Sequence, residues 1–163
     1  MTHPTPPRGG APVGFLTELP QVEAAAVCFL RHWCESSQTQ KQVIQDLNHL
    51  LGPTHGPIAI DSLGQMCALF SRFARRPLMR HHSGCSCLGA DEACFANLVA
   101  DATAGHREDA MLFAMLIVRA DFAPALTGLA EQFGIALSVL NRNVTSSSSS
   151  SSSEQVQAEA TLH

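Results

Sequence analysis

Residues 107–134 read REDAMLFAMLIVRADFAPALTGLAEQFG, and this stretch decides the fold that the sequence predicts. Its first part is apolar over most of a helical surface from 110 to 118, which is typical of a helix in the centre of a bundle. A second helix is expected to begin within 121–124 and to end at Gly134, because proline favours a first turn and glycine follows a last one. The apolar residues of this second helix repeat at helical spacing and are Ala125, Leu126, Leu129 and Phe133.

Four earlier stretches also carry apolar residues at helical spacing. They predict helices over 20–36, 39–51, 60–75 and 91–105. We expect Gly52-Pro53 to end the second of these helices and residues 54–57 to form a turn. The last piece, 135–141, fits either a strand or a helical turn. The prediction is an all-α fold, a compact bundle of about five to six helices.

The two ends of the chain differ in composition from the middle. Residues 1–17 are rich in proline and glycine and show no periodicity, so we expect a disordered head. Residues 143–163 include an unbroken serine run at 146–153, which cannot bury enough apolar surface to offset chain entropy. We therefore predict a single helical domain over 18–142, followed by a disordered Ser-rich tail.

Composition and charge limit the classes of function that the 163-residue chain favours. The net charge is −4 and the pI is near 6.0, which gives no general reason to expect nucleic acid or an anionic membrane as a partner. The sequence contains no uninterrupted run of ~18 apolar residues, so we do not expect a membrane span. Without an apparent export signal, we expect a cytoplasmic protein with reduced thiols, so its six cysteines point to core packing, metal binding or redox chemistry.

A cysteine/histidine cluster lies in the segment 79–95, which reads MRHHSGCSCLGADEACF. Its candidate metal ligands are Cys85, Cys87, Cys94, His81 and His82. Zinc takes four ligands from thiolate and imidazole, so the three cysteines and one of the two histidines could complete a site. An iron–sulfur cluster is less favoured because it normally needs four ligands, mostly cysteine, and only Cys67 could approach as a fourth.

Two other interpretations of the same cysteines stay open. If Asp91 caps the helix over 91–105, Cys94 occupies its third position, where unpaired N–H groups favour the thiolate. A thiolate there is also easily oxidised, so the cluster could be a thiol-redox switch without a metal. In the third interpretation, Cys94 packs beside Phe95, and Cys85 and Cys87 are small loop residues with no chemical role.

Other candidate residues have ordinary structural explanations. Cys28 and Cys34 are expected to behave as small hydrophobes on the first helix. A basic cluster consists of Arg72, Arg75, Arg76 and Arg80. We interpret it as the cationic end of the helix over 60–75, which offsets the helix dipole, in preference to an anion or nucleic-acid patch. The polar residues that open the helix over 107–120 are typical of a first turn, although they could assist catalysis; they are His106, Glu108 and Asp109.

The sequence therefore predicts a small non-enzymatic regulatory or adaptor protein. Its segment 76–94, held by zinc or poised for thiol oxidation, would present a surface to a protein partner. One alternative is a small metal- or thiol-dependent enzyme with a concave pocket beside the cysteines. Another is a helical protein with no metal site, and a helix-turn-helix DNA-binding module is a weaker one. Oligomeric state stays open.

Overall fold

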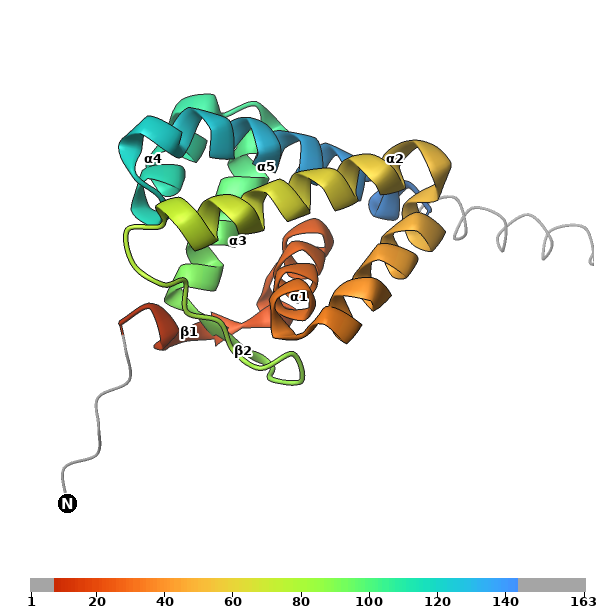
Figure 1. The fold of residues 1–163 in the computed structure, drawn as a ribbon, viewed down its shortest axis with the longest axis horizontal. Coiled ribbons are helices and arrows are strands. Elements are labelled where there is room, and N and C mark those ends of the chain that lie inside the picture. Colours follow the sequence, from red (N-terminus) through yellow and green to blue (C-terminus); the bar gives the residue numbers. More distant parts are fainter. Residues whose placement is uncertain (1–7, 144–163) are drawn as a thin grey trace, which may run out of the picture.

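The computed structural model describes residues 8–143, and this part of the chain is mostly helical (Figure 1). Its five α helices are α1 (Gln21–Glu35), α2 (Ser37–Phe73), α3 (Ala90–Ala104), α4 (Arg107–Ile117) and α5 (Ala123–Leu137). The shorter elements are the 3-10 helices η1 (Arg8–Gly10), η2 (Leu16–Glu18) and η3 (Ala120–Phe122) and the strands β1 (Pro12–Phe15) and β2 (Cys87–Gly89). The predicted helical bundle is confirmed. Apart from Asn143, the predicted Ser-rich tail lies outside the described residues.

Helix α5 is the central helix of the bundle. It packs against each of the other four α helices, and Leu126, Phe133 and Leu137 are fully buried within it. The sequence assigned the central position to the preceding helix, and this prediction was wrong. Leu112 and Leu116 of α4 are 59% and 61% exposed, because α4 packs mainly on α3 and α5 and leaves its other face open.

The chain stays largely helical beyond α5, so residues 135–141 form helix and not a strand. The stretch Ala120–Asn143 is long and apolar enough to cross a membrane by length and composition alone. In its most apolar window, 44% of the residues are buried inside the protein. Core helices pass the same test for length and composition, so this stretch is only weak support for a membrane span.

Helix α2 is two helices joined at a sharp kink. The sequence predicted two helices separated by a turn, and the structure reduces that turn to Gly52, whose φ of 75° and ψ of −176° are not helical. Pro53 follows immediately and opens the second arm of the helix. A backbone N–H in the first turn of a helix has no partner within the helix, so the lack of this group in proline costs nothing there. Figure 1 shows the result: the two arms of α2 run in different directions from the kink.

The first described residues form a β-ribbon with a distant segment. β1 pairs antiparallel with β2, with Pro12 opposite Gly89 and Phe15 opposite Cys87. Residues 8–17, which the sequence placed in a disordered head, therefore belong to the folded part, and residues 1–7 lie outside the described residues. The sequence did not reveal the ribbon because each strand is short and its partner is far away along the chain.

We expect Gly52→Ala to lower the free energy of unfolding by about 1–3 kcal/mol, because the backbone region that Gly52 adopts is almost restricted to glycine. Urea denaturation of the purified variant measures this change. Gly128→Ala in α5 is the matched control, since neither glycine has an atom within 4 Å of an added Cβ. Gly128 is helical, so its replacement should stabilise the protein by up to about 1 kcal/mol. Equal effects of the two substitutions would contradict this explanation of the kink.

Candidate functional site

A buried ion pair joins α1 to the start of α3. The Nε and Nη2 atoms of Arg31 donate to the two carboxylate oxygens of Glu92 at 2.7 and 2.8 Å. The side chains are 1% and 0% exposed. A bidentate arrangement of this kind is the strongest geometry for an arginine–carboxylate pair. The pair therefore fixes the position of α3 relative to α1.

The same two side chains shape the segment that carries the cysteine/histidine cluster. Arg31 also donates to the backbone carbonyls of Cys85 and Cys87, both at 2.6 Å. Glu92 accepts from the backbone N–H groups of His81 and Gly89, both at 2.9 Å. Four backbone groups of this segment are thus satisfied by one ion pair. The conformation of this segment depends on Arg31 and Glu92.

The start of α3 differs from the prediction. Gly89, not Asp91, is the N-cap, and Cys94 is the fifth residue of the helix, not the third. The Asp91 carboxylate instead accepts two hydrogen bonds from Arg76, at 2.7 and 2.8 Å. Burial raises the pKa of the Cys94 thiol, and the nearby Asp91 carboxylate raises it further, while Arg76 opposes both. The thiolate expected for Cys94 from the helix dipole is therefore not favoured.

The predicted metal ligands are directed toward different partners. The Nδ1 atom of His81 lies 3.1 Å from a Glu92 oxygen, and Nε2 of His82 lies 3.2 Å from Glu35. Among residues 8–143, no group of three or more His, Cys, Asp or Glu side chains is arranged to hold a metal ion. The zinc site and the less favoured iron–sulfur cluster thus gain no support from the geometry and stay predictions.

Of the three cysteines of the cluster, Cys85 and Cys87 interact with each other, whereas Cys94 lines a hollow that they do not line. The Sγ atom of Cys85 accepts a hydrogen bond of 3.4 Å from the backbone N–H of Cys87. A side-chain hydrogen bond with Cys85 raises the pKa of the Cys87 thiol. Cys94 lines a small hollow of about 280 Å³ beside Leu116 and Ile117, which neither Cys85 nor Cys87 lines.

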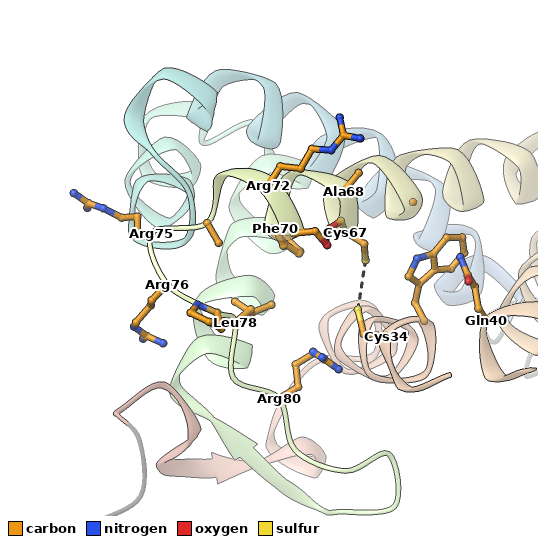
Figure 2. A pocket seen from close by; sticks show the side chains of 15 residues that line it. Cys34, Gln40, Cys67, Ala68, Phe70, Arg72, Arg75, Arg76, Leu78 and Arg80 are labelled. Carbon is orange, nitrogen blue, oxygen red and sulfur yellow. Dashed lines mark hydrogen bonds between the residues drawn. The ribbon is translucent and has the colours of Figure 1, made fainter. Parts of the chain in front are cut away.

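A larger groove of about 840 Å³ lies between the end of α1, the second arm of α2 and the segment that follows α2 (Figure 2). Cys34 of α1 and Cys67 of α2 face each other there, with their Sγ atoms 3.7 Å apart. The sequence treated Cys34 as a packing residue, and it placed Cys67 on the inward face of the helix over 60–75 or as a fourth cluster ligand. Both cysteines adjoin the apolar stripe of a helix, and only the packing of α1 against α2 brings them together.

The two thiols of the groove have different acidities. A hydrogen bond from Cys67 lowers the pKa of Cys34 to about 7, and the positive charge of Arg80 helps, while burial opposes the shift. The pKa of Cys67 is raised, because its thiol proton is held by the Cys34 sulfur and because burial disfavours its charge. Cys34 is therefore the more acidic thiol of the pair and the one that supplies the nucleophilic thiolate, and Cys67 is the thiol that donates to it.

All four arginines of the basic cluster line the groove. α2 ends at Phe73, so Arg75, Arg76 and Arg80 lie beyond it, and only Arg72 belongs to its last turn. The interpretation of the cluster as a helix end thus holds for one arginine of the four. Figure 2 shows Arg80 extending toward Cys34 from the segment that crosses below it.

The position of this segment is fixed by contacts between the end of α2 and the α4–η3 junction. The rings of Phe73 and Phe122 stack with centroids 3.7 Å apart. The backbone N–H of Arg75 donates to Ile117 at 3.0 Å, and that of Arg119 donates to Phe73 at 3.0 Å. The groove therefore has an anchored wall on this side. The polar residues proposed to assist catalysis, His106, Glu108 and Asp109, lie at the exposed start of α4, and none of them lines the groove.

We expect Glu92→Gln to lower the free energy of unfolding by about 3–5 kcal/mol, because it leaves the buried Arg31 charge without a counter-charge. Burial raises the pKa of Glu92, but hydrogen bonds from Arg31, Gly89 and His81 outweigh it and bring the pKa to about 2. A carboxylate with a lowered pKa stabilises the fold above its ordinary value of 4.5, and that stability is lost as the pH falls toward 2.

Urea denaturation between pH 7 and about pH 2 tests this prediction. The wild-type free energy of unfolding should fall with pH, and the part due to Glu92 should be missing in Glu92→Gln. Glu108→Gln, at an exposed position of α4, is the control and should change stability by no more than about 0.5 kcal/mol. Equal stability of Glu92→Gln and Glu108→Gln at neutral pH would show that the ion pair does not hold the segment.

Searches for similarity to this chain find no matching protein-family model, curated protein or solved structure, so its function has to be argued from the groove and its side chains.

Proposed function

We propose that this chain is a small regulatory protein that responds to oxidation by forming a disulfide between Cys34 and Cys67. The observation that carries the proposal is the Sγ–Sγ distance of 3.7 Å between two free thiols that both line an open groove. A disulfide needs a sulfur separation of about 2.05 Å, so the two sulfurs have to come roughly 1.7 Å closer. The thiol chemistry predicted for residues 81–94 is thus proposed for a different pair of cysteines.

The chemistry of the pair fits a reversible switch. The Cys34 thiolate attacks an oxidant of the disulfide or peroxide class, and the S–S or O–O bond of the oxidant breaks. One half stays bonded to the Cys34 sulfur, and the other half leaves as a thiolate or as hydroxide or alkoxide. The Cys67 sulfur, which loses its proton, then attacks the Cys34 sulfur and expels the half that is bonded to it. Two thiols become one disulfide, and the oxidant accepts the two electrons. Excess reduced thiol restores the two thiols by attacking the Cys34–Cys67 disulfide, and the reducing thiol is itself oxidised to a disulfide.

A regulatory role fits the groove better than catalysis by acid and base. Its lining contains two thiols and four arginines but no carboxylate or histidine. Arginine stays protonated at any physiological pH, so it cannot serve as a general base. The groove thus offers a nucleophile and positive charge, and Cys34, the nucleophile itself, is its side chain that ionises near neutral pH.

The route from the thiol pair to a protein partner runs through α1. Arg31 lies one helical turn before Cys34 and holds the segment 81–92 through the Cys85 and Cys87 carbonyls. A shift of the end of α1 during disulfide formation would therefore act on this segment. Residues 76–94, the surface first considered for a partner, are the part that we propose changes between the reduced and oxidised forms.

Oxidation of the full chain with neutral hydroxyethyl disulfide should form one intramolecular disulfide, mapped by peptide mass spectrometry to Cys34 and Cys67. Cys67→Ser should abolish it and leave Cys34 as a mixed disulfide. Cys28→Ser is the control, because Cys28 also lies on α1 but does not line the groove, and this variant should oxidise like the wild type. A disulfide between Cys85 and Cys87, or none at all, would overturn the proposal.

The rate of alkylation of Cys34 by iodoacetamide should rise with pH with a midpoint at about 7, the pKa that its surroundings give it. In Cys67→Ala the midpoint should move up toward the ordinary thiol value of 9.0, because the hydrogen bond from Cys67 is lost. Cys28, whose pKa burial raises, provides the comparison within the same protein and should react only at higher pH. An unchanged midpoint in Cys67→Ala would mean that Cys67 does not activate Cys34.

A further inference from the structure

The charge of the groove is opposite in sign to that of the protein. The chain carries a net charge of −4, yet the groove lining contains the four arginines and no aspartate or glutamate. Positively charged side chains that line a hollow attract anions and raise the local concentration of those anions. On charge alone, the groove should therefore favour anionic small molecules over neutral or cationic ones.

Two of these arginines remain uncompensated. Arg76 pairs with Asp91, and Arg75 donates to the Met115 carbonyl at 3.1 Å. In the described part of the chain, Arg72 and Arg80 have no carboxylate within ion-pair distance. In the view of Figure 2 they lie on opposite sides of the Cys34–Cys67 pair. Figure 2 shows Arg80 extending toward Cys34 and the Arg72 guanidinium pointing away from the thiol pair, so Arg80 is the free cation that a ligand at the thiols would meet.

The size and walls of the groove favour an organic ligand over a peroxide. Its volume of about 840 Å³ is within the range of small-molecule sites and is far larger than a peroxide needs. Trp33, Phe70 and Leu78 supply apolar surface beside the sulfurs, and Gln40 adds an amide. A molecule with an apolar centre and acidic ends matches these walls.

We infer that the groove is a binding site for a low-molecular-weight disulfide that carries carboxylate groups, and that this compound is the oxidant of the Cys34–Cys67 pair. The inference rests on the proposed function and names the chemical class of its oxidant. A carboxylate of the ligand would pair with Arg80, which places the disulfide bond near Cys34, and Arg72 at the rim would add to the attraction of anions. Guanidinium–carboxylate pairing gives both orientation and affinity at such a site.

The exchange balances without any further reactant. The Cys34 thiolate attacks one sulfur of the bound disulfide, the bond between the two ligand sulfurs breaks, and one ligand half leaves as a thiolate. Cys67 then gives up its proton and attacks the Cys34 sulfur, and the second ligand half leaves as a thiolate. The protein dithiol is oxidised to a disulfide, and the ligand disulfide is reduced to two thiols.

A charge series of oxidants tests this inference on the full chain. The probes are oxidised glutathione, which is anionic, hydroxyethyl disulfide, which is neutral, and cystamine, which is cationic. The rate of Cys34–Cys67 disulfide formation is measured for each at low and high salt. We expect the anionic probe to react about tenfold faster than the neutral one at low salt, the cationic probe to be slowest, and salt to reduce the differences.

Variants locate the charge that is responsible. Arg80→Gln should reduce the ratio of the anionic to the neutral rate, and Arg72→Gln should reduce it less, because its guanidinium points away from the thiols. The ratio cancels any change in Cys34 reactivity that affects both probes. Arg119→Gln is the matched control, because Arg119 is exposed, pairs with Asp121 and does not line the groove. This control should keep the wild-type ratio.

The outcomes separate the two proposals. Equal rates for the three probes, or an equal loss of the ratio in Arg119→Gln, would overturn the inference about the ligand while leaving the thiol switch intact. A much faster reaction with hydrogen peroxide than with any disulfide would also overturn it. Failure of every oxidant to join Cys34 to Cys67 would overturn the proposed function itself.

Discussion

The buried pair of Arg31 and Glu92 is the interaction on which the rest of this structure depends. Moving two charges out of water is costly unless each is fully paired and hydrogen-bonded. Here every oxygen and nitrogen is used, because the pair also binds the backbone of the segment between α2 and α3. Among the described residues, no buried side-chain nitrogen or oxygen lacks a hydrogen-bond partner. The pair thus gives a fixed shape to a segment with little secondary structure.

Most of the helical fold could be predicted from the sequence because it depends on local periodicity. Apolar spacing located the helices, and Gly105 correctly marked the end of α3, where its φ of 84° satisfies a left-handed C-cap. The order of burial was harder to predict. α4 has the more continuous apolar sequence, but α5 became central, because the position of a helix depends on how many neighbours it contacts and not on its own composition.

The candidate site could not be predicted in the same way. The spacing of Cys85, Cys87 and Cys94 drew attention to a local cluster, whereas Cys34 and Cys67 are separated by 33 positions and belong to different helices. Their proximity is a property of tertiary packing, for which one sequence contains no periodic signal. The same holds for the buried ion pair, because nothing in the sequence spacing of Arg31 and Glu92 indicates that they are partners.

The kink at Gly52 has a geometric consequence for the thiol pair. An uninterrupted helix rises 1.5 Å per residue and would carry Cys67 about 45 Å from Ser37. Cys34 lies just before Ser37, yet its sulfur is 3.7 Å from that of Cys67. The chain can return over this distance only because Gly52 reverses part of its course, so residues 34–67 form a nearly closed ring with one open link between two sulfur atoms. A disulfide bond between these two sulfurs would close the end of α1 and the two arms of α2 into one covalent loop, with its sharpest bend at Gly52.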